Sequence, residues 1–197
     1  MGCDIHLYTE ALQTVNGTAT WRNVDNWRFS RYTDEAPYEQ SPVYRERDYS
    51  LFAVLAGVRD YSDSGNPVIA EPRGLPNDVS PQTKAESDGW DGDGHTHSWL
   101  TLLELRGYFS ENPNNKEAGL ISLEAAAKLD AGVLPTEWCQ GTNKRDVIRR
   151  EWEMPNTGLG KLIAALEDRA RDVFWIFNEP VSDATAAKMR IVFWFDN

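Results

Sequence analysis

Residues 190–196 are the segment that most constrains the fold of this chain. Ile191, Phe193 and Phe195 alternate there with Arg190, Val192, Trp194 and Asp196, and the segment contains no proline or glycine. β-branched and aromatic residues with a period of two favour a strand, because successive side chains point to opposite faces of a sheet. The segment is apolar over most of its length, which predicts a central strand.

Residues 3–12 alternate in a similar way. Cys3, Ile5 and Leu7 fall on one face of the predicted strand, and Asp4, His6 and Tyr8 fall on the other. If this strand and the strand at 190–196 are antiparallel neighbours, the end of one lies beside the start of the other. Asp196 would then lie within reach of Asp4 or His6.

The remaining segments alternate helix and strand patterns with loops. Asn16-Gly17 predicts a hairpin, and residues 20–29 and 173–177 predict further strands. Apolar runs with caps and glycine stops predict helices at 49–58, 81–88, 101–109, 122–129 and 159–171. Residues 60–80 predict a long loop. The predicted fold class is α+β: a single domain over residues 1–197, a mainly antiparallel sheet with its N- and C-terminal strands adjacent, and helices packed on it.

Composition excludes several classes of partner. The formal net charge of -11 repels polyanions, which argues against binding of long nucleic acid and leaves a small anionic ligand open. No apolar stretch approaches the roughly 20 residues of a membrane helix. Two cysteines are too few for a disulfide framework, so a cytoplasmic protein is predicted. The sequence does not determine the oligomeric state.

All three histidines of the chain lie in two short motifs. His6 follows Asp4-Ile5, and His95 and His97 lie in Gly94-His95-Thr96-His97-Ser98. Residues two apart on an extended segment point to the same face, so each motif presents a pair of ligand-type side chains. We therefore predict that Asp4, His6, His95 and His97 bind zinc or manganese, with a water at an open position. Such a water becomes a nucleophile near neutral pH, and His95, His97 and Asp4 are the predicted catalytic residues.

The same histidines also fit roles without a metal. Imidazoles transfer protons or hydrogen-bond to a ligand, and many histidines only cap loops. The preceding segment 88–94 holds three aspartates and three glycines, but a calcium loop fits it poorly, because His95 stands where the next oxygen ligand belongs. A solvated acidic turn is the favoured interpretation of this segment.

Arginines and a tryptophan form the predicted ligand-binding set. Arg47, Arg59 and Arg73, together with Arg45, lie in or beside the loops that flank the predicted helix at 49–58. Guanidinium groups bind phosphate or carboxylate in bidentate geometry. Trp90 would stack on a base or sugar. The competing interpretation is that each arginine pairs with one of the 31 acidic residues of the chain and each tryptophan is packed.

Several motifs, in order along the chain, carry a resemblance to a known family. They are Met1-Gly2-Cys3-Asp4-Ile5-His6, residues 47–59 with the sequence RDYSLFAVLAGVR, Pro72-Arg73-Gly74-Leu75-Pro76, residues 95–100 with the sequence HTHSWL, and Phe193-Trp194-Phe195-Asp196. The chain resembles a family of uncharacterised phage and prophage proteins. That resemblance implies a cytoplasmic setting in a bacterial host cell, and it implies no particular activity.

Three functions follow as expectations. The first is a metal-dependent hydrolase, such as a phosphoesterase that acts on a small nucleotide-like anion. The second is a non-catalytic phage protein that binds and sequesters a small nucleotide or signal molecule in a pocket lined by the same residues. The third is an acidic protein-binding inhibitor that works through its negatively charged surface.

Overall fold

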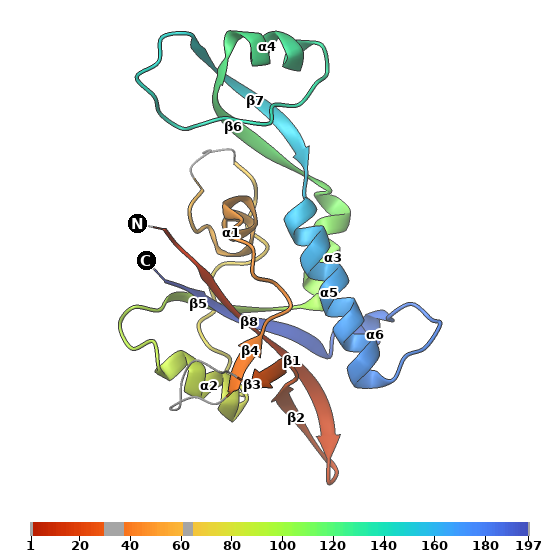
Figure 1. Ribbon diagram of the computed structural model, residues 1–197. Helices are drawn as coiled ribbons and strands as arrows, with labels where there is room; N and C mark the ends of the chain where they lie inside the picture. The colour runs from red at the N-terminus through yellow and green to blue at the C-terminus, as the bar shows by residue number, and fades with distance from the viewer. Residues whose placement is uncertain (1, 30–37, 61–64, 197) are drawn as a thin grey trace.

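A computed structural model describes residues 2–29, 38–60 and 65–196 of the chain. Its centre is a four-stranded antiparallel sheet with the order β2-β1-β8-β5 (Figure 1). The strands are β1 (Ile5–Val15), β2 (Thr18–Asn23), β8 (Met189–Phe195) and β5 (His95–Thr101). The predicted α+β class and antiparallel sheet are thereby confirmed.

The terminal strands are direct neighbours, as the sequence predicted. β1 and β8 pair from Ile5 opposite Phe195 to Ala11 opposite Met189, and β8 lies between β1 and β5. The hairpin from β1 to β2 turns at Asn16 and Gly17, with φ angles of 51° and 80°. Two consecutive left-handed residues are typical of the tight turn that an Asn-Gly pair favours.

One face of the sheet forms the main core. Leu7 of β1 and Phe193 and Phe195 of β8 are fully or almost fully buried there. Three helices cover this face: α1 (Tyr49–Ala56), α3 (Leu102–Glu111) and α5 (Thr157–Phe174). Side-chain caps begin the first two helices, since Asp48 accepts from Leu51 N and Thr101 accepts from Glu104 N.

The opposite face of the sheet carries polar and aromatic side chains. Helix α2 (Pro81–Asp88) contacts it, with Tyr8 Oη donating to Glu86 at 3.2 Å. Further along this face, Glu10 and Arg190 form a buried ion pair of 2.7 Å. Charged groups are tolerated at this depth only when they are paired and hydrogen-bonded, so this pair is a structural element of the sheet.

A second, smaller cluster of buried residues lies on a separate hairpin. Strands β6 (Asn114–Ser122) and β7 (Val147–Pro155) pair with each other, and α4 (Leu123–Asp130) packs beside them. Ile121, Ala126 and Trp152 form the centre of this cluster. Figure 1 shows the hairpin and α4 beyond the far ends of α3 and α5, away from the four-stranded sheet. The single domain over residues 1–197 stays a prediction.

The shorter elements complete the chain. Strands β3 (Asn26–Phe29) and β4 (Tyr38–Ser41) form a two-stranded ribbon, and α6 (Asp183–Ala186) is a single turn before β8. The part of 60–80 that the structure describes contains neither helix nor strand, in agreement with the predicted loop. No helix among the described residues has the length and apolar character needed to span a membrane.

The sequence analysis was wrong about one strand. Residues 173–177 do not form a strand, because α5 continues to Phe174 and Trp175 then takes a left-handed conformation. The apolar letters of this segment are compatible with either structure, and the periodicity of α5 extends through them. The extended segment expected at His95 and His97 is part of β5, whereas strands β6 and β7 were not predicted.

Candidate functional site

The two terminal strands bring three of the predicted polar groups together. Asp4 N donates to Asp196 Oδ1 at 2.7 Å, and His6 Nε2 lies 3.2 Å from Asp196 Oδ2. The expectation that Asp196 lies beside Asp4 and His6 is therefore confirmed. The side chains of His6 and Asp196 are about one-fifth exposed, so this pair is accessible from solvent.

The indole of Trp194 lies between the imidazoles of His6 and His97. Its centroid is 5.9 Å from that of His6 on β1 and 5.4 Å from that of His97 on β5. Those strands flank β8, so their backbones are separated by two strand spacings, about 10 Å. Two nitrogens that share one zinc lie within about 4 Å of each other, because each Zn–N bond is about 2 Å long. His6 and His97 are not placed to share an ion.

A β-bulge separates His95 from His97. His95 pairs with Phe195 and Ser98 pairs with Phe193, so two residues of β5 oppose the single residue Trp194. Thr96, within the bulge, has a φ of 54°. His95 therefore lies on the core face beside Phe195, whereas His97 stacks on Trp194 on the other face. The expectation that both imidazoles share a face is wrong, because it assumed a regular strand.

The predicted metal ligands do not converge. Both carboxylate oxygens of Asp4 accept hydrogen bonds from Arg47, at 2.7 and 2.6 Å. His95 Nδ1 bonds to Thr96 Oγ1 at 2.8 Å. Within the described ranges, no group of three or more His, Cys, Asp or Glu side chains is arranged to hold a metal ion. The described residues thus offer no preformed set of three ligands for zinc or manganese, and the metal site stays a prediction.

His97 instead makes a polar contact with helix α2. Its Nε2 lies 3.0 Å from the hydroxyl of Ser87, which is buried in the last turn of α2. Burial lowers the pKa of the His97 imidazole, and the nearby His95 lowers it further. A neutral His97 is suited to hydrogen bonding and packing on this face of the sheet.

Arg73 and Trp90, like Arg47, have intramolecular partners. Arg73 forms an ion pair of 2.6 Å with Glu104 and lies 4.7 Å above the Trp99 ring. Trp90 packs against His6, with ring centroids 3.9 Å apart. These contacts agree with the competing interpretation, in which each arginine pairs with an acidic residue and each tryptophan is packed.

Arg47 and Arg59 line a cavity of about 460 Å³ between helix α1 and the β6–β7 hairpin. Its walls come from the start of α1, from the segment that follows α1, from β6, and from residues 138–140. The segment after α1 is fixed to β6, because Asn66 Nδ2 donates to Lys116 O at 2.8 Å and Lys116 N donates to Asn66 Oδ1 at 2.9 Å. The cavity lies between the two hydrophobic clusters, where ligand sites are often found.

Carboxylates outnumber guanidinium groups in this cavity. Its acidic residues are Glu46, Asp48, Asp60 and Glu117, against Arg47 and Arg59. Glu117 accepts from Ser50 Oγ at 2.6 Å. Burial raises the pKa of Glu117, and the charges of Asp48 and Asp60 raise it further. The wall around Glu117 is therefore a region of unfavourable negative charge that a positive or proton-donating group would relieve.

Aromatic side chains border the same carboxylates. Tyr49 and Trp138 line the cavity, and Trp138 is held edge-on against Trp152, with centroids 5.5 Å apart. An aromatic face beside carboxylates is typical of sites for cations that carry an apolar part. Glu117 and Trp138 were not predicted from the sequence, because they lie far along the chain from Arg47 and Arg59 and no local motif joins them.

The cavity is linked to the terminal strands through Arg47. Its guanidinium binds Asp4, the Asp4 amide donates to Asp196, and Asp196 contacts His6. The Arg47 hydrogen bond holds the pKa of Asp4 below its usual value. Asp4, His6 and Arg47, which the sequence analysis chose separately, thus form one chain of contacts.

Comparison of the chain with protein-family models, with curated protein sequences and with solved structures finds no match. The residues themselves therefore carry the functional argument.

Proposed function

We propose that this protein binds a small organic cation with a planar apolar part in the cavity between α1 and β6. The observation that carries the proposal is the position of Glu117, a buried carboxylate in the wall of a cavity of about 460 Å³ that Trp138 also lines. Cavities of roughly 300–1,000 Å³ are typical of small-molecule sites. This function is the non-catalytic binding protein expected from the sequence, with the charge of the ligand revised.

Electrostatics support a cation over the small anion that the sequence predicted. Arg47 is already neutralised by Asp4 in a bidentate pair. An incoming phosphate would face Asp48, Asp60 and Glu117 at short range, and like charges in a partly desolvated site are costly. An amidinium or ammonium group, in contrast, would form charge-assisted hydrogen bonds with the Glu117 carboxylate.

Calorimetric titration with defined compounds tests this proposal. The compounds are benzamidine and tyramine as planar cations, adenosine as an uncharged planar molecule, and AMP and inorganic phosphate as anions. We expect at least one planar cation to bind and AMP to bind more weakly than adenosine. Glu117→Gln and Trp138→Ala should each weaken cation binding roughly tenfold or more, because each removes one half of the recognition.

Glu124→Gln is the matched control. Glu124 is an exposed glutamate on α4 that pairs with Lys128, outside the cavity lining. Its replacement changes the net charge by the same amount as Glu117→Gln and should leave binding unchanged. Binding of AMP or phosphate without binding of either cation would contradict the proposal and favour the anionic ligand.

A metal-dependent hydrolase is the second, less supported proposal. The accessible His6–Asp196 pair favours it, since imidazole and carboxylate are common zinc ligands. The separation of His6, His95 and His97 described above weighs against it. Elemental analysis of untagged protein separates the two proposals: we expect less than stoichiometric zinc and manganese, and a full equivalent that His6→Ala removes would reverse this ranking.

A further inference from the structure

The loop between α5 and α6 exposes two aromatic side chains. Trp175 is 78% exposed and Phe177 is 71% exposed. Their rings touch edge-on, with centroids 6.4 Å apart. Exposed single apolar residues are ordinary, but here two large aromatics in mutual contact bury little surface inside the molecule, and aromatics are among the residue types enriched in protein interfaces.

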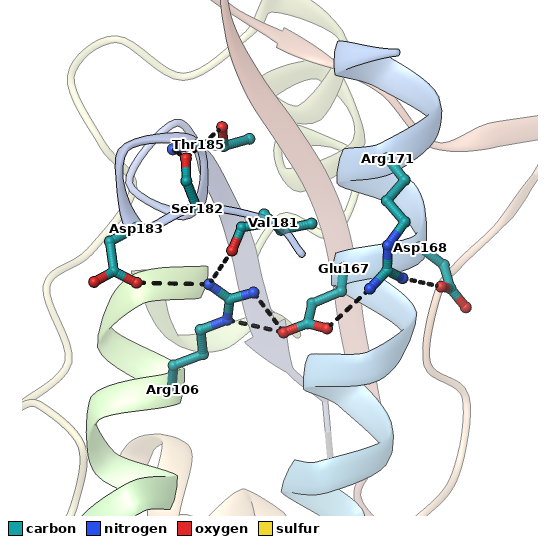
Figure 2. A network of polar contacts seen from close by, with 8 residues as sticks. All are labelled: Arg106, Glu167, Asp168, Arg171, Val181, Ser182, Asp183 and Thr185. Carbon is teal, nitrogen blue, oxygen red and sulfur yellow. Dashed lines mark hydrogen bonds and ion pairs between the residues drawn. The ribbon is translucent and has the colours of Figure 1, made fainter. Parts of the chain in front are cut away.

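Polar contacts hold both ends of this loop. Figure 2 shows Arg106 of α3 between Glu167 of α5 and the carbonyl of Val181, with Nε–Oε1 and Nη1–O distances of 2.9 Å each. At the start of the loop, Ile176 N donates to Arg171 O at 3.0 Å. A loop that is already ordered loses less entropy when a partner binds, so these contacts favour recognition.

The backbone at Trp175 argues against a purely structural role for this residue. Trp175 has a φ of 56° directly after the last residue of α5. Glycine is the usual residue at such a helix end, because a Cβ is strained in the left-handed region. Tryptophan there costs stability and buries little surface, so neither the backbone nor the core accounts for it.

Acidic side chains surround the aromatic pair along the chain. Asp168 and Asp183 are 77% and 83% exposed, and Asp172 and Glu179 are exposed as well. The nearby Arg171 and Arg106 are engaged in ion pairs with this same set of acids and with Glu167. Residues 167–183, which include the aromatic pair, carry five acidic and two basic side chains and so have a net negative charge; these acidic side chains are called the rim.

We propose that Trp175 and Phe177 form the centre of a docking surface for a basic protein whose apolar recess takes the two rings. The charge of the rim decides the class of partner. A second copy of this chain carries the same net charge of -11 and would be repelled, as would an anionic membrane. This proposal is independent of the cavity described above.

Fluorescence anisotropy with two labelled peptides tests the proposal. The probes are a short amphipathic helical peptide of leucine and lysine, and a peptide of the same length with glutamate in place of lysine. We expect the protein of residues 1–197 to bind the lysine peptide only. Trp175→Gly and Phe177→Ala should each weaken that binding roughly tenfold or more, as truncation of a central interface aromatic does.

Two features separate this result from general instability and from unspecific charge attraction. Trp175→Gly relieves the strained backbone, so its midpoint of thermal unfolding should equal or exceed that of the parent protein. Phe29→Ala is the matched control, since Phe29 is 65% exposed and contacts Tyr38 edge-on at 6.0 Å on another part of the molecule. It should leave peptide binding unchanged.

The salt dependence of peptide binding and the oligomeric state of the protein provide further tests of the proposal. Raising the ionic strength from about 0.05 to about 0.3 M should weaken binding severalfold, because the rim charges are exposed and screened. No binding of the lysine peptide, or equal binding by Trp175→Gly, would overturn the proposal. Two further results would also overturn the proposal. A dimer in analytical ultracentrifugation that Trp175→Gly abolishes would indicate that a second copy of the chain binds this surface. Co-sedimentation with phosphatidylglycerol vesicles would indicate an anionic membrane.

Discussion

The His97 imidazole is in contact with Ser87 on one side and with the Trp194 indole on the other. Both contacts are compatible with a neutral ring, and burial lowers the pKa of His97 below the ordinary 6.5. The Nε2 atom faces the Ser87 hydroxyl at 3.0 Å, a contact that holds the ring against helix α2. At the scale of the residue, His97 is a packed histidine whose protonation is coupled to folding.

This coupling predicts a pH dependence of stability. Just below pH 6.5 the unfolded chain binds a proton at His97 that the folded protein does not bind. Stability is therefore fully present above that pH and is lost as the pH falls through the window between the unfolded and the folded pKa. As the pH is lowered from about 8 to about 5, the midpoint of thermal unfolding should fall less steeply for His97→Gln than for the parent protein. Equal slopes for the two proteins would contradict the prediction.

Helix α5 is the element that connects the cavity region with the main core. Its N-cap residue, Asn156, makes no side-chain capping hydrogen bond. Near this end of the helix, Gly158 lies against the carboxylate of Asp48, which itself caps α1 through Leu51 N at 3.1 Å. The starts of α1 and α5 are thus packed against each other through a glycine.

Gly158→Ala should therefore destabilise the protein. A Cβ at this position would overlap Asp48 Oδ2 and displace the cap of α1, and loss of such a cap costs about 0.5–2 kcal/mol. Gly160→Ala is the control, because its Cβ would lie 3.5 Å from Phe109, an ordinary contact. That variant should be neutral or up to about 1 kcal/mol more stable, since alanine favours a helix over glycine. Urea denaturation of both variants measures the difference, and equal effects would contradict this packing.

At the scale of the whole molecule, the buried Glu10–Arg190 pair joins the central strands to the long loop. Arg190 binds Glu10 of β1 at 2.7 Å and Asp78 of the loop at 2.8 Å. The other Glu10 oxygen accepts from Ser80 N at 2.9 Å, directly before α2. Arg190 also lies 4.0 Å above the Trp21 ring of β2. One charge network therefore fixes the sheet and the position of α2.

Removal of one partner of the Glu10–Arg190 pair should destabilise the protein more than replacement of both. Arg190→Ala leaves Glu10 buried without a counter-charge, and such a loss costs about 3–5 kcal/mol. The double variant Glu10→Gln, Arg190→Met should cost clearly less, because no charge is then left unpaired. Lys161→Ala breaks an exposed pair with Glu46 and should cost less than about 1 kcal/mol. Denaturant midpoints rank the three variants, and a cost for Arg190→Ala similar to that of Lys161→Ala would contradict the structural role.

Local sequence patterns were sufficient to predict the helices and strands whose formation depends on residues close together in the sequence. The alternation in 3–12 and 190–196 predicted β1 and β8, and the helices predicted at 81–88, 101–109 and 122–129 correspond to α2, α3 and α4. Strands β6 and β7 escaped prediction because Asn114–Ser122 and Val147–Pro155 alternate weakly and are mostly stabilised by each other. Pairing over such a separation is a tertiary property.

For the candidate site, too, some features follow from the sequence and others depend on the tertiary structure. The sequence by itself determined which side chains of 3–12 and of 190–196 share a face, because a strand has a period of two. The pairing of β1 with β8 in the tertiary structure then brought Asp4, His6 and Asp196 together. Only the tertiary structure decided that His95 and His97 point to opposite faces, since a bulge is set by pairing with β8. It also decided that Glu117 and Trp138 share a cavity with Arg47 and Arg59, because that cavity forms only where two separately packed hydrophobic clusters meet.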